Sequence, residues 1–180
     1  MKNKSSAILY FFLLVAFAAN VCAQNQSVSL NRQRIAENSS KDNSTVNTFA
    51  LEKLVFQLVN RQRAANGLPE VIWSDEVAKV ARVHSQNMAK YKFFEHRGLD
   101  GLMVTDRAYS LGVKNWWAIG ENLALNRGFA NPTETTVESW MKSIAHRKNI
   151  LAERWKESGV GIARAADDSL YFTQVFLVKK

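Results

Sequence analysis

Four ionisable side chains stand in largely apolar stretches of the sequence and could support proton transfer or metal binding: His84, His96, Glu121 and His146. A neutral imidazole binds divalent cations and exchanges protons near neutral pH, and a carboxylate can act as a general base. His96 and His146 lie 50 positions apart (146 − 96), which is not a local ligand spacing. Spacing alone therefore favours two unrelated polar histidines over a metal site.

Glu121 lies in the segment WWAIGENLALN, which runs from Trp116 to Asn126. Most residues of this segment are apolar, as in a buried strand. An ionised carboxylate is tolerated in such a place only if another group pairs with it, protonates it or keeps it in contact with water. The sequence therefore predicts a partner for Glu121.

His84 and Glu95 can be explained without a functional role. His84 shares one helical face with the apolar residues of segment 77–88, so we expect a buried histidine that is hydrogen-bonded to the backbone. Glu95 precedes His96 in an expected loop, and an acid in a loop is usually a solvated surface charge.

Several familiar catalytic motifs are absent from the sequence. It contains no G-x-S-x-G nucleophile motif, no phosphate-binding P-loop, no glycine-rich dinucleotide fingerprint and no H-E-x-x-H zinc motif. The single cysteine, Cys22, falls in an expected leader sequence. Without it, thiol catalysis and cysteine-ligated zinc are excluded, and no organic cofactor is predicted.

Residues 1–23 have the pattern of a secretory signal peptide. Lys2 and Lys4 precede an apolar run from Ala7 to Ala19, and small residues allow cleavage after Ala23. The run is too short to span a bilayer comfortably, so we expect no transmembrane helix in the mature chain. The protein is predicted to be secreted or periplasmic, and the alternative is a lipoprotein anchored through an acylated Cys22.

The rest of the chain divides into a tether and one domain. Residues 24–47 are polar and rich in asparagine and serine, which is typical of a flexible tether. Beyond them, periodicity and capping residues predict five helices and three strands. The helices are expected at 51–66, 75–88, 106–112, 132–141 and 148–153, and the strands at 116–126, 159–163 and 170–178.

The last strand, from Leu170 to Val178, has apolar residues on both faces. A turn signal at residues 165–169 joins it to the preceding strand in an expected antiparallel hairpin. Both faces of such a sheet need to be covered by helices. The sequence therefore predicts an α/β fold, a three-layer α/β/α sandwich with a small, mostly antiparallel central sheet.

The chain has a formal net charge of +8. This balance favours acidic partners, among them anionic polymers of the cell envelope and anionic lipids. The basic residues are scattered and no helix-turn-helix, RNA-binding or zinc-finger pattern is present, so nucleic acid is not an expected partner.

Seven sequence blocks occur in an order that resembles one protein family. The blocks are LVNRQR with a following GL and W (residues 58–73), ARVHS with MA (81–89), FEH (94–96), GENLA (120–124), W with S and HRKNIL (140–151), GVG (159–161) and YFTQVF (171–176). Together they resemble the CAP superfamily of cysteine-rich secretory proteins, venom antigens and plant pathogenesis-related proteins. The resemblance is in particular to its cysteine-free bacterial branch, the SCP domain, here placed at residues 48–180.

The resemblance implies a central cavity that receives His96, His146 and, as the first acid, Glu121. Glu121 would then face a wet, cationic cleft, paired with imidazolium or with a metal-bound water. It also implies an exported binding module whose cleft holds a divalent cation, zinc first, on the two histidines. With only two protein ligands, the affinity should be modest and should fall as the histidines protonate.

One departure from the family pattern is Ser143, which occupies the position of a second acid in many eukaryotic members.

Two alternatives to the cation-binding module follow from the resemblance. One is a metal-dependent hydrolase of envelope or extracellular substrates, with Glu121 as general base. The other is a lipid-binding or protein-interaction module in which the histidines are incidental.

Overall fold

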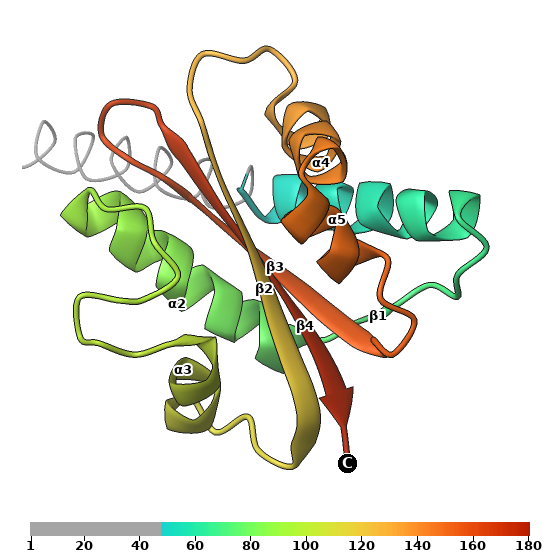
Figure 1. The fold of residues 1–180 in the computed structure, drawn as a ribbon. Coiled ribbons are helices and arrows are strands. Elements are labelled where there is room, and N and C mark those ends of the chain that lie inside the picture. The colour runs from blue at the N-terminus through green and yellow to red at the C-terminus, as the bar shows by residue number, and fades with distance from the viewer. Residues whose placement is uncertain (1–47) are drawn as a thin grey trace, which may run out of the picture. The chain divides into compact units, whose positions relative to one another are not determined.

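The computed structural model describes residues 48–180 (Figure 1). The signal peptide with Cys22 and the tether, both predicted within residues 1–47, lie outside the described residues. The described part begins with helical residues 48–65, which are followed by eight elements. These are β1 (Ile72–Trp73), α2 (Asp75–Tyr91), α3 (Val104–Ser110), β2 (Trp116–Asn126), α4 (Pro132–Lys142), α5 (Ile144–Ile150), β3 (Glu157–Arg164) and β4 (Leu170–Lys179).

The four strands form one sheet in the order β1-β3-β4-β2. β3 and β4 form the expected antiparallel hairpin, in which Glu157 is paired with Leu177 and Arg164 with Leu170. β2 runs antiparallel to β4 along the other side. The two-residue strand β1 pairs in parallel with β3 and was not predicted. The mostly antiparallel sheet is confirmed.

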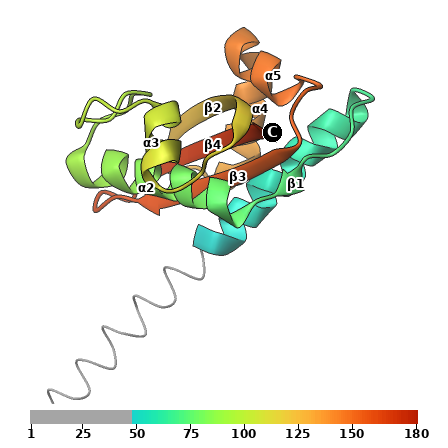
Figure 2. The same ribbon diagram turned by 90° about the horizontal axis from the view of Figure 1, so that it is seen from below.

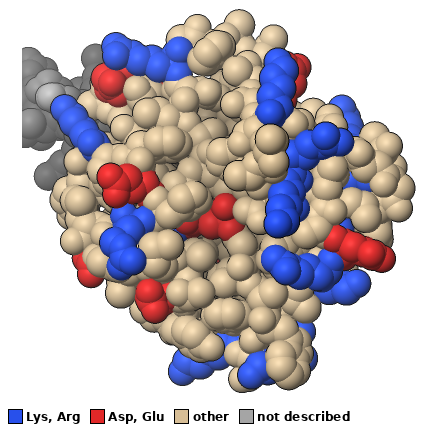
Figure 3. All heavy atoms as spheres, in the orientation of Figure 1, with Lys and Arg blue, Asp and Glu red and all other residues tan. Residues whose placement is uncertain are grey.

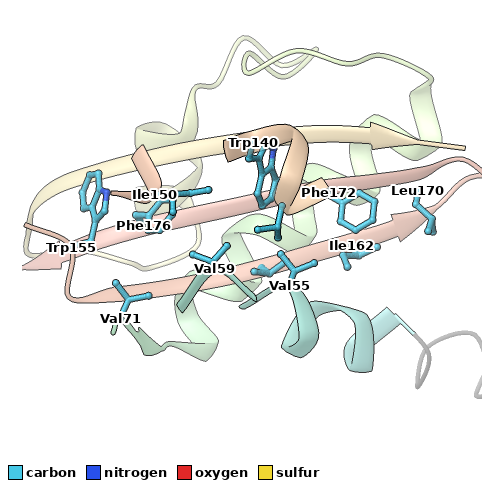
Figure 4. Close-up of a cluster of buried hydrophobic side chains, with 12 residues drawn as sticks. Val55, Val59, Val71, Trp140, Ile150, Trp155, Ile162, Leu170, Phe172 and Phe176 are labelled. Atoms are coloured by element: carbon cyan, nitrogen blue, oxygen red, sulfur yellow. The ribbon is translucent and has the colours of Figure 1, made fainter. Parts of the chain in front are cut away.

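Helices cover both faces of the sheet, so the three-layer α/β/α arrangement is confirmed (Figure 2). On one face, Phe172 and Phe176 pack with residues from helix 48–65, α4 and α5 (Figure 4). On the other face, Val175 and Leu177 pack with apolar residues of α2 and α3. The alternation along β4 thus divides the hydrophobic core into two halves.

Two glycines of β3 allow α2 to lie directly on the sheet. A Cβ atom added at Gly161 would be 2.2 Å from the backbone nitrogen of Arg82, and one at Gly159 would be 2.1 Å from that of Ala78. Only a residue without a side chain permits so close an approach of two backbones. The GVGIA segment therefore fixes the distance between helix and sheet.

The position of α5 corrects the predicted helix at 148–153. The helix spans Ile144–Ile150, and Ser143 is an extended residue between α4 and α5. Arg63 donates hydrogen bonds from Nη1 to the carbonyl oxygens of Ile150 (2.7 Å) and Ala152 (2.9 Å). Its guanidinium group thus satisfies backbone carbonyls at the C-terminal end of α5. Arg63 and Ile150 are 87 positions apart, so the sequence around α5 does not reveal where the helix ends. His146 consequently lies on a helix.

Within residues 48–180, no helix is long and apolar enough to cross a membrane.

Candidate functional site

Glu121 lies in the middle of β2 and is opposite Val175 of β4. Directly opposed residues of an antiparallel pair project on the same side, so Glu121 projects into the layer of α2 and α3. There its Oε1 accepts a hydrogen bond from Nδ1 of His96 at 2.8 Å. His96 belongs to the loop between α2 and α3. The structure therefore brings together two of the three predicted site residues.

Arg107 of α3 is the second partner of Glu121, and it was not predicted. Its Nη2 donates to Oε2 of Glu121, and the two side chains form an ion pair. Its Nη1 also donates to the carbonyl oxygens of His96 (3.0 Å) and Leu102 (2.9 Å). One buried guanidinium group therefore holds both Glu121 and the loop that carries His96.

The sequence did contain a signal for Arg107. Val104, Ala108 and Leu111 are apolar and have the spacing of one helical face, and Arg107 falls on that face. A cation on the apolar face of a helix requires a buried acceptor. Glu121 supplies it.

His84 is fully buried, and it interacts electrostatically with the cluster of Glu121, His96 and Arg107. Its Nε2 is 2.9 Å from the carbonyl oxygen of Glu95. Since a carbonyl only accepts, Nε2 carries the proton. Burial lowers the pKa of His84, and the negative charge of Glu121 partly opposes this effect. The predicted buried histidine is confirmed, and its hydrogen bond fixes the residue that precedes His96.

His146 approaches from α5, which is attached to the outer edge of β2. Nδ2 of Asn122 donates to the carbonyl oxygen of His146 at 3.2 Å, and Nδ2 of Asn149 donates to that of Glu121 at 3.1 Å. Burial, and next the positive charge of His96, lower the pKa of His146. The two imidazoles come from different parts of the fold, His96 from the loop between α2 and α3 and His146 from α5.

The family resemblance implies a zinc ion, which needs a group of His, Cys, Asp or Glu side chains as ligands. Among the side chains of residues 48–180, no three His, Cys, Asp or Glu side chains lie close enough together to hold a metal ion. Both oxygens of Glu121 already accept hydrogen bonds, from His96 and Arg107. The residues therefore do not form a three-ligand catalytic zinc centre.

The surface around the cluster is unevenly charged. In the view of Figure 3, acidic atoms near the middle of the molecule are partly covered by uncharged residues. Lysine and arginine side chains gather over α4 and α5 in the same view. The side chain of His96 is 49% exposed, while that of Glu121 is 3% exposed. A ligand can therefore reach the imidazole of His96 but not readily the carboxylate behind it.

Comparison with known proteins gives a family match over most of the described residues. The sequence model described as "CAP: Cysteine-rich secretory protein family" matches residues 56–176. Two curated relatives come from Bacillus subtilis. The uncharacterized protein YkwD is 31% identical over 158 residues, which are 87% of this chain and 59% of YkwD. The uncharacterized membrane protein YlbC is 32% identical over 126 residues, which are 70% of this chain and 34% of YlbC.

Solved structures with the same fold include two bacterial proteins. An extracellular protein containing an SCP domain from Bacillus anthracis has a TM-score of 0.65 at 29% identity, covering 73% of this chain and 41% of that one. An outer surface protein from Borrelia burgdorferi has a TM-score of 0.67 at 18% identity, covering 74% of this chain and 96% of that one. At 18% identity the second likeness concerns the fold alone.

Proposed function

The chain belongs to the CAP family of cysteine-rich secretory proteins, and on that premise we propose that it is an exported binding module. Its candidate ligand is a divalent cation, zinc first, held by His96 and His146. The module would act at the cell envelope or outside the cell. The observation that carries this proposal is the hydrogen bond between Nδ1 of His96 and Oε1 of Glu121, at 2.8 Å.

This hydrogen bond determines which nitrogen of His96 is free. A carboxylate only accepts hydrogen bonds, so Nδ1 must carry the proton. In the neutral ring, Nε2 then has its lone pair available on a side chain that is 49% exposed. A carboxylate behind a histidine is a common support for a metal-binding imidazole, because it fixes the tautomer and the ring orientation. Glu121 is thus a positioning residue for His96.

His146 supplies the second candidate ligand. Burial and the nearby His96 lower its pKa, so its ring stays neutral to a lower pH than a free imidazole. A neutral ring is the form that binds a cation. With two protein ligands, the affinity should be weaker than that of three- or four-ligand zinc sites. When bound, such an ion would supply Lewis-acid character to whatever completes its coordination.

The hydrolase alternative receives less support from the geometry. It requires Glu121 to take a proton from water, but both of its oxygens accept from protein donors and its side chain is 3% exposed. A general base must be within hydrogen-bond reach of the proton that it removes. The arrangement favours a carboxylate that holds His96 over one that activates water.

Export is supported by the signal-peptide pattern of residues 1–23 and by an extracellular protein among the similar structures. We propose a secreted or periplasmic location, with a lipoprotein anchored through Cys22 as the alternative. Mass spectrometry of the mature N-terminus distinguishes the two. A chain that begins at Gln24 supports cleavage after Ala23, and an acylated Cys22 supports the lipoprotein.

The cation site is tested by titrating zinc into the purified, untagged chain at about pH 7.5, where the histidines are mostly neutral, and measuring heat. We expect His96→Ala and His146→Ala each to abolish measurable binding. Glu121→Gln should weaken it by about 10- to 100-fold, the usual effect of losing an outer-shell partner. Lys79→Gln, on the exposed side of α2, is the control. Equal binding by the wild type and both histidine variants would remove these residues from the site.

A further inference from the structure

A row of cations follows α5 and the segment after it. Residues 142–156 contain five cationic side chains and one acid, Glu153. All five cations are exposed: Lys142, Arg147, Lys148, Arg154 and Lys156. We refer to these five residues as the α5 ridge. Figure 3 shows lysine and arginine side chains over this part of the molecule.

Within the described residues, four of the five ridge residues have no acidic partner. Among residues 48–180, no salt bridge involves Arg147, Lys148, Arg154 or Lys156, and Lys142 has only a 3.9 Å contact with Glu138. Two other surface cations are paired with acids, Arg164 with Asp168 and Lys179 with Glu157. The ridge is therefore a concentration of positive charge that the described residues do not neutralise.

The backbone beneath the ridge is held rigidly. Arg63 binds the carbonyl oxygens of Ile150 and Ala152. Asn149 donates to the backbone of β2 at 3.1 Å, and Nε1 of Trp155 donates to the carbonyl oxygen of Asn149 at 2.7 Å. A ligand that meets a preorganised set of cations loses less conformational entropy on binding than one that must order a loop.

We propose that the α5 ridge binds a linear polyol-phosphate polymer, a chain of phosphodiester-linked polyols. The proposal goes beyond the cation site, since none of the five side chains is a proposed metal ligand. Five cations within 15 consecutive residues, from the end of α4 through α5 to the segment before β3, match a ligand with repeated charges better than a single small ion. The guanidinium groups of Arg147 and Arg154 can each form two parallel hydrogen bonds with one phosphate.

Two other polyanionic partners fit the ridge less well. Single-stranded nucleic acid is usually bound by exposed aromatic side chains on which bases stack, but Trp155, the single aromatic residue of segment 142–156, is only 1% exposed. A helix that inserts into an anionic membrane surface does so through a continuous apolar face. In this segment Ile144, at 89% exposure, is the only large exposed apolar side chain. A phosphodiester polymer without bases or acyl chains requires neither feature.

One ridge residue adjoins the candidate cation site, because Arg147 follows His146 directly on α5. A polymer bound along the ridge would therefore pass close to His146. This places its phosphates close to any cation held there. The two sites can nevertheless be tested separately, since the ridge side chains and the histidines are different residues.

The test uses fluorescently labelled poly(glycerol phosphate) and the full-length mature chain, with binding followed by anisotropy at low salt in the presence of EDTA. We expect the double variant Arg147→Gln/Lys148→Gln to raise the Kd about 30-fold. Each cation lost near an anionic surface is expected to weaken the affinity about fivefold. The dependence of log Kd on log salt should become shallower by about 1.4, as for two fewer phosphate contacts with a single strand.

The matched control is Lys79→Gln/Lys90→Gln, which removes two exposed charges from α2 on the other face of the sheet. Its Kd should stay close to that of the wild type. Circular dichroism of all variants checks that they are folded. Equal losses in the ridge variant and this control would mean that net charge alone drives binding, and would overturn the proposal.

Competition identifies the partner class. Unlabelled poly(glycerol phosphate) should displace the probe at a lower concentration of charge than single-stranded DNA or phosphatidylglycerol vesicles. Stronger displacement by either of these would replace the proposed ligand with a nucleic acid or a membrane. His146→Ala should still bind the polymer, and the ridge variant should still bind zinc. Failure of the zinc titration thus leaves the ridge proposal intact, whereas a ridge variant that binds the polymer normally refutes it.

Discussion

Arg107 and Glu121 form an ion pair in which each side chain is only 3% exposed. Burying two charges is costly unless their remaining donors and acceptors are also satisfied. Here Glu121 also accepts from His96, and Nη1 of Arg107 also donates to two backbone carbonyls of the loop that carries His96, while the buried Nε of Arg107 has no partner within residues 48–180. The pair thus joins α3, β2 and the His96 loop into one unit.

Replacing Arg107 should destabilise the fold strongly. Arg107→Met leaves the carboxylate of Glu121 buried with a single partner and removes one donor from each of two loop carbonyls. We expect a loss of about 3–5 kcal/mol in the free energy of unfolding, measured by urea denaturation. Arg97→Met is the control, because Arg97 is exposed and donates only to Gly101 within the described residues. It should change the stability by about 0.5 kcal/mol or less.

The double variant Arg107→Met/Glu121→Leu separates a stability role from a positioning role. Removing both charges should recover much of the lost stability, because no unpaired charge remains. Zinc binding should not recover, since His96 has lost its carboxylate. Recovery of zinc affinity together with stability would contradict the positioning role of Glu121.

Gly161→Ala should disrupt the contact between α2 and the sheet. The new Cβ would be 2.2 Å from the backbone nitrogen of Arg82, so either the helix or the strand must move. We expect a loss of about 3 kcal/mol, the upper part of the range for overpacked cores, measured by urea denaturation. A change below about 1 kcal/mol would show that α2 can shift without penalty and that the close approach is not required.

The buried His84 should make the fold less stable in mild acid. Its pKa is lowered in the folded state, first by burial, from its usual value of 6.5. Below about pH 6.5 the unfolded chain therefore binds more protons than the folded chain, and stability falls as the pH drops. This contribution is fully present above the unfolded pKa and is lost as the pH falls through the lowered folded pKa.

Urea denaturation of the wild type and His84→Gln between about pH 7.5 and about pH 5 measures this contribution, because that range spans the titration of histidine. Glu121, Arg107 and His96 also act on His84 electrostatically and remain in both proteins, so the difference between the two slopes isolates the ring. We expect the variant to be less stable at the upper end of this range but to lose less stability on acidification. Parallel curves would contradict a titrating buried His84.

Much of the fold could be predicted because it depends on local patterns. The alternation along β4 placed Phe172 and Phe176 on one face and Val175 and Leu177 on the other, as the two core clusters confirm. The turn at 165–169 gave the hairpin. Strand β1 could not be predicted, because two residues carry no periodicity and their pairing depends on β3, more than 80 positions away (157 − 72 = 85).

The site could be predicted only in part, and for a different reason. His96 and Glu121 were joined by family resemblance, since their spacing in the chain indicates nothing about contact. Arg107 was not predicted, although its neighbours at helical spacing are apolar, because nothing near it in the sequence indicates that its partner is Glu121. The end of α5 was misplaced because it depends on Arg63, which belongs to a distant helix. Long-range polar contacts of this kind leave no local pattern.

The most direct test of the account is nitrogen-15 NMR of the histidine rings at about pH 8, where imidazole is neutral, with and without zinc. The account predicts that neutral His96 carries its proton on Nδ1, hydrogen-bonded to Glu121, and that zinc shifts the Nε2 resonance of His96 together with a ring nitrogen of His146. A His96 ring protonated on Nε2, or zinc that leaves both rings unchanged, would contradict it.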